Sequence, residues 1–240
     1  MRWANNSTKK LWILFFIIAG VMILTLVIRE INKPTPSVRV TTETKIKLPA
    51  PVYNSTISIE KTLKQRRSIR RYKDDALTLQ QVSQLLWAAQ GITSPNGFRT
   101  APSAGGLYPL EIYLVSGNVL DLPAGVYHYL PAENTLELLI EGDKRAALRA
   151  AALHQRSITF APANIVMTAV YARTTKKYGP NGKKYVHMEV GHAAQNVCLQ
   201  AVSLGLGAVT VGAIDEPAFK AILTLPEEET PLYIIPVGKI

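Results

Sequence analysis

The chain has a single cysteine, Cys198, so it has neither a disulfide bond within the chain nor a cysteine-rich metal centre. That thiol lies in an alanine-rich segment, which favours a buried apolar residue over a nucleophile. The sequence also lacks a Walker loop and a GxSxG elbow. Its glycines at 205, 207 and 212 precede a strand and do not have G-x-G-x-x-G spacing, which argues against a nicotinamide-binding Rossmann domain.

Acidic residues are scarce: 17 Asp and Glu face 27 Lys and Arg, for a net charge of +10. The excess is local, because residues 61–73 (KTLKQRRSIRRYK) carry +7 and residues 1–50 carry +6, leaving the remainder slightly acidic. Such a basic block suits a phosphorylated ligand, an anionic membrane surface or nucleic acid. Without interleaved aromatics, a zinc signature or a recognition helix, nucleic acid ranks last.

Long apolar runs are absent except at the N-terminus, where residues 11–28 (LWILFFIIAGVMILTLVI) carry no charge. This run is long enough to span a membrane, and no small-x-small cleavage site follows it. We therefore predict an N-terminal flank over 1–10, a retained single-pass transmembrane helix over 11–28, a linker over 29–57 and one domain over 58–240. Basic residues flank both ends of the span, so the side of the membrane that holds the domain stays open.

With 48% hydrophobic residues the chain can bury a substantial core. The pattern predicts alternating helices and strands. One helix over 78–90 has a Thr78–Gln81 capping box and stops at Gly91. Further helices are predicted over about 143–154, over 186–204 and after Asp215, and strands over 111–116, 125–130, 135–141, 164–172 and 208–214.

The predicted helix over 186–204 has an apolar face and a polar stripe that includes Glu189 and His192. Its small residues permit close approach of another helix, within one domain or across a dimer. A lone histidine such as His192 is more often structural than a metal ligand or a catalytic base.

The stretch TAPSAGGLYPLEIYLV, residues 100–115, opens with eight small or turn-forming residues and continues as a half-buried strand. Its glycine pair either makes a tight turn or lets backbone N–H groups approach a flat or anionic ligand.

Five motifs in order, RRSIRRY (66–72), PSAGGLYPLE (102–111), HMEVGHAAQN (187–196), LGLGAVTVGAID (204–215) and IIPVGK (234–239), resemble the nitroreductase superfamily of FMN enzymes. Within it the sequence is most similar to the SagB-type branch, which includes azoline-oxidising dehydrogenases. The resemblance implies an α+β fold with a central, mostly antiparallel sheet flanked by helices. It also implies FMN as cofactor and a homodimer whose active sites are shared between the subunits.

By this resemblance, Arg66, Arg67 and Ser68 hold the FMN phosphate and ribityl chain, and Arg70 lies near the pyrimidine edge of the flavin. Backbone approach to the flavin is implied for Pro102, Ser103, Ala104 and Gly105, and near flavin N5 for Val211, Gly212 and Ala213. Family members often place a further basic residue after the last strand to bind phosphate, and here Lys239 is the one available before Ile240. Azoline-oxidising members carry a Lys–Tyr pair near the substrate. Lys184–Tyr185 is the preferred match by position, and Lys177–Tyr178 is an alternative. Both pairs could equally belong to a solvated loop without a catalytic role.

The implied activity is hydride transfer at flavin N5. Two substrate classes stay open, namely quinones or nitroaromatics reduced with NAD(P)H and a modified peptide that is dehydrogenated. A third interpretation is a membrane-surface binding protein that kept the fold without flavin. No metal ion is expected to take part.

Overall fold

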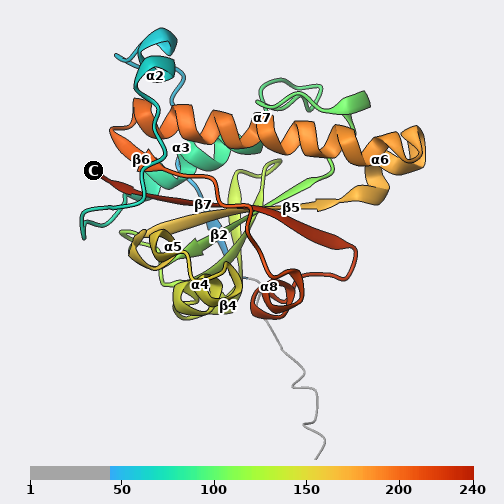
Figure 1. Cartoon of the computed structure of the whole chain (residues 1–240). Coiled ribbons are helices and arrows are strands. Elements are labelled where there is room, and N and C mark those ends of the chain that lie inside the picture. The colour runs from blue at the N-terminus through green and yellow to red at the C-terminus, as the bar shows by residue number, and fades with distance from the viewer. Residues whose placement is uncertain (1–43) are drawn as a thin grey trace, which may run out of the picture. The chain divides into compact units, whose positions relative to one another are not determined.

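The computed structural model describes residues 44–240, which fold around one antiparallel sheet (Figure 1). Its strands are β1 (Lys45–Lys47), β2 (Leu110–Ser116), β3 (Gly125–Leu130), β4 (Thr135–Glu141), β5 (Ala163–Val170), β6 (Leu206–Ala208) and β7 (Glu229–Lys239). Their order in the sheet is β1-β4-β3-β2-β5-β7-β6, and every neighbouring pair is antiparallel. The strands predicted over 111–116, 125–130, 135–141 and 164–172 are confirmed to within two residues.

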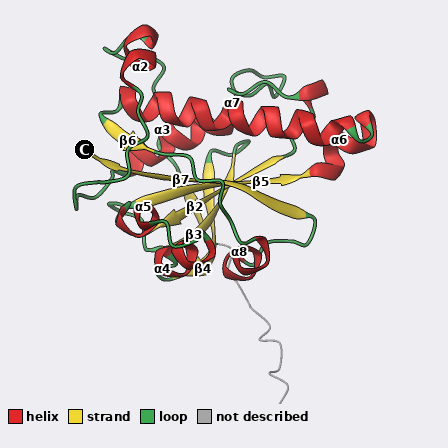
Figure 2. Ribbon diagram, viewed as in Figure 1, coloured by secondary structure: helices red, strands yellow, loops and turns green. Residues whose placement is uncertain are grey.

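Helices cover both faces of the sheet, as Figure 2 shows, with α3 and α7 on one face and α4, α5 and α8 on the other. Their bounds are α2 (Ile59–Gln65), α3 (Leu79–Gln90), α4 (Arg145–Ala151), α5 (Arg156–Phe160), α6 (Tyr171–Tyr178), α7 (Asn181–Ser203) and α8 (Glu216–Leu223). The α+β class with a central antiparallel sheet is therefore confirmed, whereas α2, α5 and α6 were not predicted.

Local sequence signals set the ends of two helices. Thr78 caps α3, since its side chain accepts from the Gln81 N–H while the Gln81 side chain accepts from the Thr78 N–H. The helix ends at Gly91, as predicted. Asp215 caps α8 by accepting from the Ala218 N–H.

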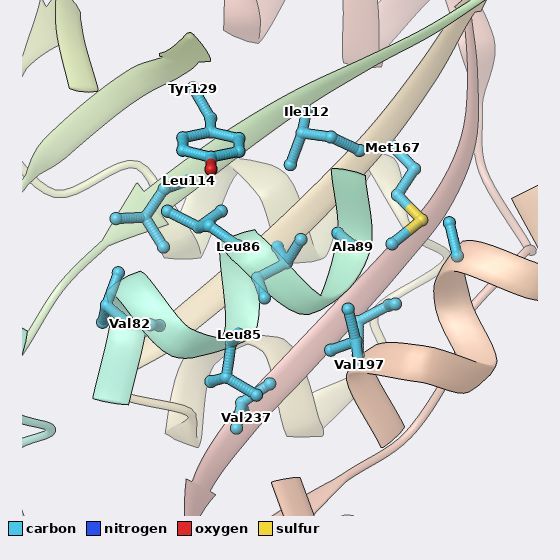
Figure 3. Packing of buried hydrophobic residues seen from close by; sticks show 14 of the residues in the cluster. Val82, Leu85, Leu86, Ala89, Ile112, Leu114, Tyr129, Met167, Val197 and Val237 are labelled. Carbon is cyan, nitrogen blue, oxygen red and sulfur yellow. The ribbon is translucent and has the colours of Figure 1, made fainter. Parts of the chain in front are cut away.

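The main core lies between the sheet and the helices α3 and α7 (Figure 3). Side chains of β2 alternate, so that Ile112 and Leu114 enter this core while Tyr113 and Val115 enter a second core beneath α4 and α8. The prediction that this strand is only half-buried is therefore wrong, because a sheet covered by helices on both sides buries both faces of its central strands.

The domain begins before the predicted boundary at residue 58. Lys45–Lys47 form the edge strand β1 beside β4, and the next residue, Leu48, is buried in the main core with 3% of its surface exposed. The Leu48 N–H donates to the Asn134 carbonyl at 3.0 Å. The predicted linker over 29–57 therefore includes residues that belong to the domain. Its proline-rich composition gave no sign of the short strand at Lys45–Lys47.

Residues 44–240 contain no helix that is long and apolar enough to cross a membrane. The predicted flank over 1–10, the span over 11–28 and residues 29–43 of the predicted linker lie outside the described residues.

Candidate functional site

The basic segment after α2 lies against the end of the sheet. Ser68 and Ala208 form a parallel bridge, and the Ile69 N–H donates to the Ala208 carbonyl at 3.0 Å. Four residues later the Lys73 N–H donates to the Lys239 carbonyl at 2.9 Å. The fold thus brings the arginines of the RRSIRRY motif to the edge formed by β6 and the end of β7.

Glycine at position 207 is required for this approach. A Cβ there would lie 2.5 Å from the Ile240 side chain and 2.7 Å from the Ile69 side chain. Both distances are shorter than a carbon–carbon contact allows, so any larger residue at 207 would push the basic segment away from β6.

Arginine side chains on this segment donate hydrogen bonds to backbone carbonyls and are not neutralised by carboxylates of residues 44–240. Arg67 Nη1 donates to the carbonyls of Lys64 and Arg66 at 3.0 and 2.7 Å, and Arg70 Nη1 donates to the Ser68 carbonyl at 3.5 Å. Within residues 44–240, no carboxylate forms an ion pair with Arg66, Arg67 or Arg70. Such unpaired guanidinium groups suit a phosphate.

Cys198 and His192, which the sequence analysis singled out, both lie on α7. Burial raises the pKa of the Cys198 thiol, an effect that the charge of Arg66 partly offsets. The thiol is thus protonated at neutral pH, which agrees with the predicted structural role. His192 is exposed on α7, and no group of three or more metal-ligating side chains is found in the described part of the chain.

Beyond β6 the chain follows the same edge of the sheet. Val211 pairs with Ile234 through two backbone hydrogen bonds of 2.8 and 2.9 Å, whereas Gly212 and Ala213 are exposed. The amides of these two residues form no hydrogen bond within residues 44–240. The continuous strand predicted over 208–214 is therefore wrong, since it is replaced by β6 over 206–208 and one isolated bridge.

The segment that contains Pro102, Ser103, Ala104 and Gly105 lies elsewhere, beside α6 and the first half of α7. Ser103 Oγ donates to Glu189 Oε2 at 2.5 Å and accepts from the Tyr108 N–H at 2.9 Å. Gly105 and Gly106 both have left-handed backbone, with φ of 64° and 65°. The glycine pair therefore makes a tight turn, which was one of the two predicted alternatives.

Gly105 also permits a close approach by α6. A Cβ at this position would lie 2.7 Å from the Tyr178 hydroxyl and 2.9 Å from Lys177 Nζ. The Tyr178 and Tyr185 rings meet edge to face with centroids 5.2 Å apart. The structure thus gathers Lys177, Tyr178 and Tyr185 at the turn, whereas Lys184 is exposed.

The region of these Lys–Tyr pairs is helical. Lys177–Tyr178 ends α6, and Lys184–Tyr185 belongs to the start of α7, which begins at Asn181 and not at the predicted 186. The alternative of a solvated loop is therefore wrong. Pro180 and the positive φ of Gly179 confine the non-helical part to a short turn between the two helices.

Glu189 is a site residue whose importance the sequence pattern did not reveal. It is buried, with 2% of its surface exposed, and its Oε1 atom has no hydrogen-bond partner within residues 44–240. Burial raises the pKa of Glu189 to about 7, against smaller opposing effects of the Ser103 hydrogen bond and the Arg99 charge. An acid in the polar stripe of an otherwise apolar helix was the one available signal.

The predicted site residues therefore form two groups. Arg66, Arg67, Ser68, Arg70 and Lys239 lie along the same sheet edge as Val211, Gly212 and Ala213. The other group, residues 102–105 with Lys177, Tyr178 and Tyr185, contacts the first half of α7.

Such an antiparallel sheet between two helical layers, with a basic segment along one sheet edge, defines an α+β protein. The Nitroreductase family model matches residues 63–239, and the chain belongs to the nitroreductase family. Members of this family generally use a flavin, FMN.

Individual relatives agree with this assignment. A Methanocaldococcus jannaschii protein that carries the name nitroreductase, MJ1384, is 45% identical over 183 residues, which cover 76% of this chain and 91% of that protein. The crystal structure of a Ralstonia eutropha JMP134 protein described as a nitroreductase superposes with a TM-score of 0.73 at 32% identity, covering 83% of this chain and 90% of the other. The chain is thus an oxidoreductase of the nitroreductase family.

A more distant similarity extends to peptide-processing proteins. The microcin B17-processing protein McbC of Escherichia coli is 30% identical over 136 residues, which cover 54% of this chain and 50% of McbC. The Escherichia coli microcin synthetase McbBCD complex with truncated pro-MccB17 contains a chain of the same fold, with a TM-score of 0.64 at 24% identity over 87% of this chain and 85% of that one.

Proposed function

We propose that this protein is an FMN-dependent oxidoreductase that works as a homodimer. The observation that carries the proposal is the sheet edge where Ser68 pairs with Ala208 and Val211 pairs with Ile234. There, guanidinium groups that have no carboxylate partner within residues 44–240 lie along the same edge as Gly212 and Ala213, which are exposed and whose side chains are no larger than methyl. A phosphate and a flat ring fit these two features respectively.

Different residues at this edge would bind different parts of FMN. Arg66, Arg67 and Ser68 would hold the phosphate and ribityl chain, with Lys239 at the neighbouring strand end. Arg70 would place a positive charge near the electron-accepting ring, which favours reduction. FMN, when bound, supplies hydride exchange at N5, and the small residues Gly212 and Ala213 would leave that atom accessible.

The exposed face of α7 supports a dimer with shared sites. The exposed middle of α7 carries Met188, Gly191, His192 and Gln195, and a Cβ at Gly191 would meet nothing within 4 Å, so this face is open to another helix. In such a dimer the Gly105 turn of one chain would complete the site at the Ser68 edge of the other.

A second candidate activity is azoline dehydrogenation, with the SagB-type branch as the subfamily. Its support is Lys177 and Tyr178, whose polar atoms lie directly over the Gly105 turn, together with the similarity to McbC and to the trifolitoxin-processing protein TfxB of Rhizobium leguminosarum.

For the N-terminal region we propose a single-pass membrane anchor over residues 11–28, because the run is apolar and uncharged.

The experiment that tests the proposal is FMN titration of the detergent-solubilised full chain. Arg66→Ala is expected to weaken FMN binding by about 1.5–3 kcal/mol, because a charge-assisted hydrogen bond to phosphate is lost. The matched control Arg71→Ala removes the same charge outside the predicted flavin contacts and should leave FMN affinity unchanged. If the wild-type protein shows no flavin absorbance and takes up no FMN, the proposal is refuted. The interpretation as a membrane-surface binding protein without flavin would then remain.

Substrate tests separate the two activities. The flavin-loaded protein is offered NAD(P)H with a quinone or nitroaromatic in one assay and an azoline-containing peptide in the other. If it dehydrogenates azolines, Tyr178→Phe should lower that rate far more than Tyr185→Phe. Equal effects of both changes would count against Tyr178 as the tyrosine that acts on the azoline.

A further inference from the structure

A second basic surface lies beside the proposed flavin edge, and apart from Arg70 none of its side chains is assigned to the proposed reaction. It is a cleft of about 720 Å³ between the segment that ends in Tyr72 and the connection from α4 into α5. Such a volume suits a small organic ligand. Its wall includes Arg70, Arg71, His154 and Arg156.

The charge of the cleft is all of one sign. No Asp or Glu lines it, and none of its three arginines forms an ion pair with a carboxylate within residues 44–240. Several guanidinium groups around one hollow repel one another, and a multivalent anion between them removes that repulsion.

A buried hydroxyl provides independent evidence for a ligand. Ser157, at the start of α5, lines the cleft and is 3% exposed, yet its Oγ has no hydrogen-bond partner in the described part of the chain. A buried hydroxyl without a partner is unfavourable, and a hydroxyl hydrogen rotates freely toward an acceptor. Its Oγ is itself covered by protein, so an oxyanion in the cleft supplies that acceptor only after a small shift of the α5 wall.

The backbone that presents His154 is strained. Leu153 and His154 are consecutive residues in the left-handed region, with φ of 48° and 60°. Neither is a glycine, so the conformation is unfavourable, and such strain is found preferentially at ligand-binding positions.

The cleft also offers an aromatic surface. Phe160 is 53% exposed, and the Arg156 guanidinium carbon lies 5.4 Å from its ring centroid. An exposed phenyl ring beside cations suits a flat heterocycle attached to a phosphate. A bare inorganic anion would leave this ring unused.

We propose that this cleft binds the phosphate of a soluble nucleotide, separately from the FMN cofactor. Arg71, Arg156 and the Ser157 hydroxyl hold the phosphate, and Phe160 packs against the base. Arg70 lies between this cleft and the flavin edge, so a bound nucleotide would adjoin the redox site. The site does not depend on whether flavin binds at the sheet edge.

Calorimetric titration of the FMN-loaded, detergent-solubilised full chain with AMP and with inorganic phosphate tests the proposal. AMP is expected to bind saturably and more tightly than phosphate, and Arg156→Gln should weaken it about tenfold or more. Ser157→Ala should weaken AMP binding without lowering the melting temperature. The control Lys61→Gln removes one positive charge from α2, outside the cleft, and should leave AMP affinity unchanged.

Four results would overturn the proposal. The first is the absence of saturable AMP binding. The second is an equal loss of AMP affinity in Arg156→Gln and Lys61→Gln. The third is binding of the protein to vesicles of anionic lipid without any binding of AMP. The fourth is a loss of FMN affinity in the Arg156→Gln apoprotein, because the cleft would then belong to the flavin. Failure of FMN uptake by the wild-type chain would refute the proposed function and leave the AMP measurement on the apoprotein to decide this inference.

Discussion

Glu189→Gln should remove a pH dependence of stability that is built into α7. In the folded protein, burial raises the pKa of this carboxyl from its ordinary value of 4.5 to about 7. The folded state therefore binds a proton more tightly than the unfolded state between these values. The resulting stabilisation is complete below pH 4.5 and is lost as the pH rises through about 7.

The size of the effect follows from the two pKa values. Integrating the linkage between pH 5 and pH 8 gives a loss of roughly 2–3 kcal/mol in the free energy of unfolding. Glutamine stays neutral throughout and keeps the shape of the side chain, so it preserves an acceptor for the Ser103 hydroxyl. The variant should therefore lose the pH-dependent difference and be the more stable protein at pH 8.

Urea denaturation of both proteins at several pH values and at one fixed protein concentration measures this difference. Other titrating groups cancel when the variant is subtracted from the wild type. Glu228→Gln, a change at an exposed glutamate, is the control and should leave the pH profile unchanged. A wild-type-minus-variant difference that does not change between pH 5 and pH 8 would refute the assignment of a raised pKa to Glu189.

Three further predictions concern the fold and the turn. Deletion of residues 1–43 should give a protein that folds and retains FMN, whereas deletion of 1–57 should lower the melting temperature, because it removes β1 and the buried side chain that follows it. Gly105→Ala should destabilise by about 1–2 kcal/mol in urea denaturation, since alanine is strained at φ 64° and meets Tyr178. Tyr113→Phe should cost about 1.5–3 kcal/mol, measured in the same way, because it removes a hydroxyl that donates to the buried Glu229 carboxylate and lies 3.0 and 2.8 Å from its two oxygens.

Matched changes sharpen two of these tests. Gly106→Ala introduces the same backbone strain at φ 65° but meets open space, so it should cost less than Gly105→Ala. Equal costs would mean that contact with Tyr178 has no energetic weight. A fully stable protein lacking residues 1–57 would show that β1 is dispensable.

Much of the fold was accessible from local sequence because its signals act over a few residues. The Thr78–Gln81 capping box and Gly91 fixed both ends of α3, and Asp215 fixed the start of α8. Alternating and continuous apolar runs located four strands within two residues. The strand at 45–47 was missed because three residues between prolines carry almost no periodic signal, and β4 supplies its hydrogen-bond partners from far along the chain.

The sequence by itself determined the family and the residue types of the site, since motif order and the RRSIRRY segment are properties of the chain. The tertiary structure alone decided which of those residues meet. Gly105 lies under Lys177 and Tyr178 because the turn between α6 and α7 folds one helix against the other. The raised pKa of Glu189 likewise depends on its burial beneath Ser103, and burial is a property of the packed molecule that no local pattern carries.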